Sequence, residues 1–92
     1  MLVDVVEVRA LSGHWLHVRF ADGVEGEIDL DGIVHWEGVF APLVEPERFA
    51  EVRVDPELGT VVWPNGADID PDVLYAAVTG RSIELPKAAA QR

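Results

Sequence analysis

The sequence predicts an α+β fold: a small antiparallel sheet of about five strands, one C-terminal helix packed on it, and a short helical turn in the middle segment. Two patterns carry this prediction. Apolar and polar residues alternate with the period of a strand in several short runs, and one later stretch has the caps and apolar spacing of a helix. The 92 residues leave room for one domain. We assign residues 1–80 to it and expect residues 81–92 to be a mobile tail.

The most informative element is a hairpin predicted over residues 14–30. A loop of three residues, 21–23, places Phe20 opposite Val24 and keeps the apolar residues of both strands on one face. A two-residue turn would set core residues against solvent-facing ones. On the outer face, the chosen register pairs Trp15 with Asp29, His17 with Glu27, and Arg19 with Glu25.

The remaining strands are predicted from the same alternation. Residues 3–11 form the first strand, and residues 51–55 and 60–63 form a second hairpin around a turn that ends in glycine. The side chains expected to face the core are Val6, Val8, Ala10, Val52, Val54, Val61 and Trp63.

Helical signals are confined to two places. Residues 45–49 have a proline near the start and predict a single helical turn. Residues 70–79 predict a helix in which Asp70 is the N-cap, Pro71 takes the first position and Gly80 follows the last turn. Its expected apolar stripe consists of Leu74, Ala77 and Val78.

The charge balance restricts the possible partners. Asp and Glu number 17 against 7 Lys and Arg, which gives a net charge of -10. Such a chain repels phosphate, so we expect no direct nucleic-acid binding and no association with anionic membranes. A small basic protein is the partner that this charge favours. The chain has no cysteine, no signal-peptide pattern and no long apolar run, and we expect a cytoplasmic location.

No residue pattern indicates catalysis. His14 and His17 point to opposite faces of a strand and cannot chelate a metal together, so we expect no metal and no cofactor. Glu25, Glu27 and Asp29 share one strand face, which we interpret as a solvated acidic surface and not as a catalytic carboxylate pair. We therefore predict that the protein is not an enzyme.

Two binding hypotheses remain. The first is a protein-interaction surface on the outer sheet face, formed by Trp15, His17, Arg19, Glu25, Glu27 and Asp29. An exposed Trp15 marks an interface, but the middle segment or the tail could instead cover it. The alternative is a small-molecule or regulatory pocket lined by Trp36, Phe40, Trp63 or Tyr75. Exposed strand edges also permit a homodimer.

Residues 63–75, which begin Trp-Pro-Asn-Gly and contain Asp70-Pro71, resemble the closing signature of a bacterial family, the domain of unknown function 2442. The resemblance covers about residues 2–80. Its signature residues have structural roles in turning the chain and starting the helix, and Asp68 is expected to bond turn amides. These residues are Trp63, Pro64, Asn65, Gly66, Asp68, Asp70, Pro71 and Tyr75. Some relatives are encoded beside another small protein family in what looks like a toxin–antitoxin arrangement. The resemblance therefore implies an antitoxin-like role for this chain.

Overall fold

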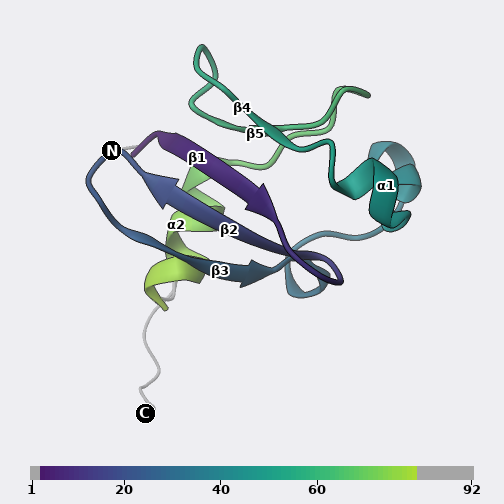
Figure 1. The fold of residues 1–92 in the computed structure, drawn as a ribbon, viewed down its shortest axis with the longest axis horizontal. Coiled ribbons are helices and arrows are strands. Elements are labelled where there is room, and N and C mark those ends of the chain that lie inside the picture. Colours follow the sequence, from purple (N-terminus) through teal and green to yellow (C-terminus); the bar gives the residue numbers. More distant parts are fainter. Residues whose placement is uncertain (1–2, 81–92) are drawn as a thin grey trace.

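The computed structural model describes residues 3–80, which form two antiparallel sheets and several helices (Figure 1). The elements in chain order are β1 (Val5–Ala10), β2 (Trp15–Phe20), β3 (Glu25–Asp29), the 3₁₀-helices η1 (Leu30–Gly32) and η2 (Gly38–Val44), α1 (Pro46–Phe49), β4 (Arg53–Asp55), β5 (Thr60–Val62) and α2 (Pro71–Thr79). The α+β class and the five strands are confirmed, but the strands divide into a sheet β1-β2-β3 and a sheet β4-β5. The predicted mobile tail lies outside the described residues.

The β2–β3 hairpin has the register that the sequence predicts. The amide of Phe20 donates to the carbonyl of Val24 at 2.8 Å and closes the three-residue loop. Gly23 ends the loop with a φ of 92°, a left-handed conformation that favours glycine. The hairpin therefore places its apolar side chains on one buried face, which consists of Leu16, Val18, Phe20 and Ile28.

Strand β1 departs from simple alternation at its start. The register shifts between Val5 and Glu7, which makes Val6 the extra residue of a β-bulge. Val5 is consequently buried and Val6 is 44% exposed, so the prediction that Val6 faces the core is wrong. Val8 and Ala10 pack against the core as predicted.

The β4–β5 hairpin lies beyond the β1 edge of the larger sheet (Figure 1). The amide of Val5 donates to the carbonyl of Gly59 at 2.9 Å, which joins the turn of this hairpin to the start of β1. The inner side chains follow the prediction, since Val61 and Trp63 are buried while Val52 and Val54 are half-buried against the core. The second sheet therefore closes one end of the core.

The middle segment is more helical than the sequence indicated. The predicted turn is present as α1, but the 3₁₀-helix η2 precedes it and contains Pro42. Trp63 packs beneath α1, and its Nε1 donates to the carbonyl of Phe49 at 3.0 Å. Because this indole is buried, the hydrogen bond satisfies a polar group that water cannot reach.

Helix α2 begins and ends where the caps predict. The Asp70 side chain accepts from the amide of Asp72, and Gly80 is left-handed with a φ of 73°. Leu74 is fully buried and Val78 packs on β3, but Ala77 is exposed, so its place in the apolar stripe is wrong. Ala77 lies about 100° around the helix from Val78 and so turns away from the sheet.

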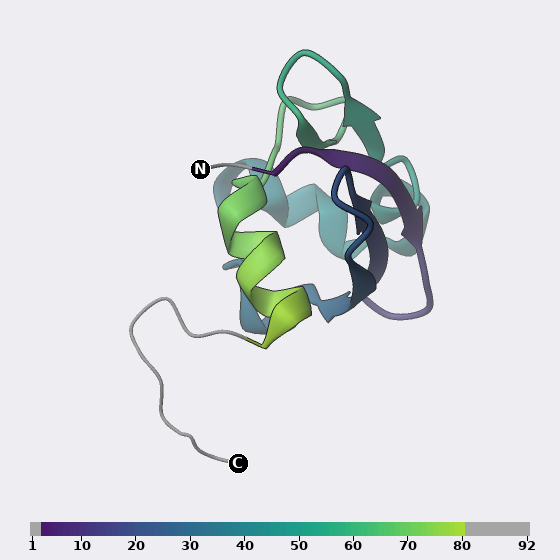
Figure 2. The ribbon, with the colours of Figure 1, turned by 90° about the vertical axis from the view of Figure 1, so that its left-hand side faces the viewer.

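The hydrophobic core lies between α2 and the larger sheet, as the side view shows (Figure 2). In this view the middle segment lies behind the core, and the β4–β5 hairpin lies above it. Its buried residues are Val5, Leu16, Val18, Phe20, Ile28, Leu30, Leu43, Phe49, Val61, Trp63, Ala67, Ile69 and Leu74. Among residues 3–80, no helix covers the other face of the larger sheet.

Candidate binding surfaces

The face of the larger sheet opposite α2, here called the outer sheet face, carries all six residues predicted to bind a partner. They are Trp15, His17 and Arg19 from β2, and Glu25, Glu27 and Asp29 from β3. The observed pairing is the predicted one, with each β2 residue opposite its expected β3 residue. This face is turned toward the viewer in Figure 1, and no described helix lies over it.

Trp15 is the large aromatic residue of this face. Its side chain is 42% exposed, although indole is among the most costly groups to leave in water. The middle segment, which the sequence left as a possible cover for Trp15, therefore does not bury it. Trp15 stands beside Gly13, whose added Cβ would lie 3.8 Å from the indole ring. The outer sheet face therefore offers an aromatic anchor at one end.

Two ion pairs on the outer sheet face join neighbouring strands, one between diagonal residues, His17 and Glu25, and one between directly opposite residues, Arg19 and Glu7. His17 Nε2 lies 2.9 Å from Oε1 of Glu25. The ion-pair partner of His17 is therefore Glu25, whereas the sequence suggested Glu27. Arg19 pairs with Glu7 of β1, with Nη2 2.8 Å from Oε1. Diagonal neighbours on one face are within reach of long side chains. Within residues 3–80, Glu27 makes no ion pair, so its carboxylate is available to a partner.

The histidines do not converge on a metal site. His17 lies on the outer sheet face, where its buried Nδ1 has no hydrogen-bond partner within the described chain. His14 lies at the aromatic end of the core, with its ring 4.4 Å from that of Trp36. In residues 3–80 no three His, Asp or Glu side chains gather as metal ligands would.

His14 forms a polar network that the sequence did not reveal. Its Nδ1 lies 3.0 Å from Oδ1 of Asp31, and its Nε2 lies 3.0 Å from the carbonyl oxygen of Val44. The hydrogen bond to Val44 raises the pKa of His14, burial opposes this, and Asp31 adds to the rise. The sequence alternation predicts His14 on the first strand of the hairpin, whereas it lies in the turn before β2, and nothing in the sequence indicates partners so far along the chain.

The signature segment between β5 and α2 is held by its own side chains. Asn65 accepts from the amide of Ala67 at 3.1 Å and donates to the carbonyl of Val39 at 2.8 Å. Gly66 completes the turn with a φ of 94°. Asn65 thus has the turn-bonding role that we expected for Asp68, because its side chain can both accept and donate.

Two further signature residues stabilise the position of α2. Pro71 is buried at its first turn. Tyr75 stacks edge-on against Phe20, with ring centroids 4.9 Å apart, and its hydroxyl donates to Oδ2 of Asp22 at 2.7 Å. This hydrogen bond is the main cause that lowers the pKa of Asp22. The helix is therefore bonded to the β2–β3 loop as well as packed on the sheet.

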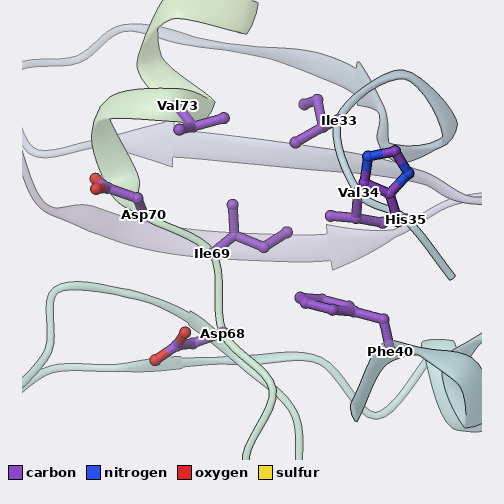
Figure 3. A pocket seen from close by; sticks show the side chains of 8 residues that line it. All are labelled: Ile33, Val34, His35, Phe40, Asp68, Ile69, Asp70 and Val73. Atoms are coloured by element: carbon purple, nitrogen blue, oxygen red, sulfur yellow. The ribbon is translucent and has the colours of Figure 1, made fainter. Parts of the chain in front are cut away.

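A pocket of about 390 Å³, here called the α2 pocket, opens beside the first turn of α2 (Figure 3). Its apolar residues are Ile33, Val34, Phe40, Ile69 and Val73, and its polar residues are His35, Asp68 and Asp70. Of the four aromatic residues proposed from the sequence, only Phe40 lines this pocket. Trp63 is buried in the core, Trp36 donates to Asp31, and Tyr75 donates to Asp22. No local sequence pattern predicted the other residues that line the α2 pocket, because three separate segments of the chain supply its lining.

These features define a class of protein: a small acidic α+β domain with an open sheet face and one apolar pocket beside its longer helix. No helix among residues 3–80 is long and apolar enough to cross a membrane. The family model described as protein of unknown function (DUF2442) matches residues 5–80, and the chain belongs to this family. Comparison with curated proteins found no match, and comparison with solved structures found none either.

Proposed function

We propose that this domain is a non-enzymatic protein-interaction module that binds a small basic protein through its outer sheet face. The observation that carries the proposal is Trp15, which is 42% exposed on a face that no described helix covers. Buried aromatic anchors contribute much of the energy of protein interfaces, and tryptophan is enriched among them. Burial of Trp15 by a partner would remove the largest exposed aromatic surface on this sheet.

The charges around Trp15 indicate what kind of surface the partner presents. Glu27 makes no ion pair in the described chain. Glu25 is bonded to His17, but its side chain is still 54% exposed. With a net charge of -10, the whole molecule also attracts basic proteins over a distance. Lys or Arg residues of the partner would therefore contact β3 while an apolar surface covers Trp15.

We propose a binding role and not a catalytic one, because the carboxylates of Glu25 and Glu27 on this face are open to water. General acid–base catalysis depends on carboxylates or histidines whose surroundings are dry enough to alter their proton affinity. Glu25 and Glu27 are exposed, and neither shares a concave site with a candidate nucleophile. The two serines of the chain, Ser12 and Ser82, also lack the sequence context of a catalytic serine.

The finer form of the proposal is an antitoxin-like role in a bacterial cytoplasm. The support is the family resemblance together with the acidic face, since an acidic module can neutralise a basic toxin by covering its charged surface. A homodimer is less well supported. β3 is an edge of the larger sheet, and two copies joined there would bring Glu25 and Glu27 close to their own symmetry mates.

The test is affinity capture of the tagged protein from its own cells, followed by titration of the purified partner by calorimetry. Trp15→Ala is expected to weaken binding at least tenfold, because loss of an interface tryptophan commonly costs more than about 1.4 kcal/mol. The double variant Glu25→Lys with Glu27→Lys is expected to lose more affinity at low salt than at high salt, since screening reduces the contribution of exposed charges.

A matched control separates the sheet face from overall charge. Glu45→Lys with Glu47→Lys makes the same change in net charge at two exposed residues, the N-cap and the first turn of α1. We expect this control to retain most of the affinity. Equal loss in both double variants would show that the partner senses only net charge. Unchanged affinity in Trp15→Ala would exclude the outer sheet face as the interface.

A further inference from the structure

The α2 pocket lies apart from the outer sheet face and has a different chemistry. It is formed on the same side of the larger sheet as α2, between the first turn of that helix, the chain after η1 and the segment before α2 (Figure 3). A volume of about 390 Å³ falls within the usual range of small-molecule sites, roughly 300–1,000 Å³. Its occupant need not be the partner of the sheet face.

The body of the pocket is apolar. Ile69 is buried at its base, and Val34 and Val73 are half-buried beside it. In Figure 3 the side chains of Ile33 and Phe40 point toward the same space from the other side. An apolar group placed here would leave water on one side of it and contact aliphatic and aromatic carbon on the others.

The charges of the pocket lie at one side. Figure 3 shows the carboxylates of Asp68 and Asp70 on the flank away from Phe40. Asp70 Oδ1 accepts from the amide of Asp72 at 2.9 Å as the N-cap of α2, and its other oxygen makes no hydrogen bond within the described chain. A second hollow, lined in part by Leu58 and Pro71, borders the same two aspartates, so a ligand can reach them.

We propose that the α2 pocket binds a small organic ammonium ion, with its apolar body against Ile69 and Val73 and its cationic group beside Asp68 and Asp70. The two carboxylates exclude organic anions by repulsion and attract a single positive charge. A bare metal ion would find only exposed, one-sided ligands there, whereas the apolar base adds affinity for a carbon skeleton. This inference does not depend on the proposed function of the sheet face.

Three probes separate the contributions of charge and apolar body. They are 2-phenylethylammonium, 2-phenylethanol and methylammonium, each titrated into ¹⁵N-labelled protein while amide shifts are recorded. The first is expected to give saturable shifts at Val34, Ile69 and Val73. The alcohol lacks the charge and is expected to bind about threefold to tenfold more weakly, as two exposed ion pairs imply. Methylammonium lacks the apolar body and should give no localised shifts.

A pair of charge-matched variants completes the test. Asp68→Asn with Asp70→Asn removes both charges while asparagine keeps the helix N-cap, and should weaken 2-phenylethylammonium about threefold to tenfold. Glu25→Gln with Glu27→Gln makes the same change in net charge on the outer sheet face and should leave this affinity unchanged. Equal binding of the alcohol, equal loss in both double variants, or no saturable shifts at the pocket would each overturn the proposal.

Discussion

The imidazole of His14 contacts the carboxylate of Asp31 through one ring nitrogen and a backbone carbonyl through the other. Nδ1 of His14 lies 3.0 Å from Oδ1 of Asp31, and Nε2 lies 3.0 Å from the carbonyl oxygen of Val44. An ionised carboxylate and a carbonyl can only accept, so both hydrogen bonds form together only when both ring nitrogens donate, which is the imidazolium form of the ring. Trp36 Nε1 donates to the same Asp31 oxygen at 3.0 Å. The His14 ring therefore links the β1–β2 turn, η1 and the end of η2, and its protonated form makes both hydrogen bonds.

This network predicts that the domain loses stability as the solution becomes basic. The carbonyl of Val44 and the carboxylate of Asp31 raise the pKa of His14 above its ordinary value of 6.5, against the effect of burial. A raised pKa in the folded state contributes stability that is complete below the unfolded pKa and disappears as pH rises through the folded one. Urea unfolding between about pH 6 and pH 8.5 should show this decline in the free energy of unfolding.

His14→Gln is expected to abolish the decline, because glutamine does not titrate. His35→Gln provides the control, since His35 is exposed and lies on the α2 pocket, away from this network. The control variant should keep the full decline seen in the wild type. If His14→Gln also kept it, another group would be responsible and the imidazolium assignment would be wrong.

A second prediction concerns the contact between Gly59 and Asp4. Gly59 has a φ of 70°, and an added Cβ would collide with the carboxylate of Asp4. Gly66 has a φ of 94° and open space around it, so alanine there meets backbone strain alone. We expect Gly66→Ala to lower the free energy of unfolding by about 1–2 kcal/mol, and Gly59→Ala to lower it by about 1 kcal/mol more. Equal losses by chemical denaturation would show that Asp4 moves aside without cost.

The parts of the fold that could be predicted from sequence depend on local chemistry. The register of the β2–β3 hairpin follows from side-chain alternation and from one left-handed residue, Gly23. The limits of α2 follow from Asp70, Pro71 and Gly80, each of which acts within one turn of its own position. In both cases the deciding interactions span only a few residues.

The parts that could not be predicted depend on contacts between distant segments. The bulge at Val6 lies where the β4–β5 turn bonds to β1, and alternation gives no sign of that meeting. His14 bonds to Val44, thirty residues away, through a backbone carbonyl that carries no sequence signal. For the same reason only Phe40 of the four aromatic residues proposed from the sequence lines the α2 pocket, whereas the six residues of the outer sheet face share one face as the register predicts.

A third prediction concerns the closeness of α2 to β3 at Gly26. A Cβ added to Gly26 would lie 2.9 Å from Cγ1 of Val78. Val78 is β-branched within a helix and cannot easily change rotamer, so Gly26→Ala should force the helix outward. We expect a loss of about 1–2 kcal/mol in the free energy of unfolding, as for other overpacked cores.

Val78→Ala supplies the matching test for Gly26. Removal of both Val78 methyl groups makes room for the new Cβ, so the double variant should be less destabilised than the sum of the two single variants. A double-mutant cycle measured by urea unfolding gives this coupling energy directly. Simple additivity of the two losses would mean that α2 does not press on Gly26 in solution.

The last prediction tests the hydrogen bond between α2 and the β2–β3 loop. The hydroxyl of Tyr75 lies 2.7 Å from Oδ2 of Asp22 and is the main cause that lowers the pKa of this carboxyl below its ordinary value of 3.8. Tyr75→Phe keeps the ring against Phe20 and removes only the donor, so the pKa of Asp22 should rise. The rise should be incomplete, because the amide of Val24 still donates to Oδ1 at 3.0 Å.

Carboxyl carbon shifts followed by NMR during an acid titration measure this change at Asp22 itself. A carboxyl whose pKa is lowered by folding contributes stability at pH values above its pKa in the unfolded state, and this contribution is lost as pH falls through its pKa in the folded state. The wild type should therefore lose more stability in acid than Tyr75→Phe. Val24→Ala is the control, since it leaves both backbone and hydroxyl donors in place and should not move the pKa of Asp22. An unchanged pKa in Tyr75→Phe would show that α2 is held to the sheet by packing alone.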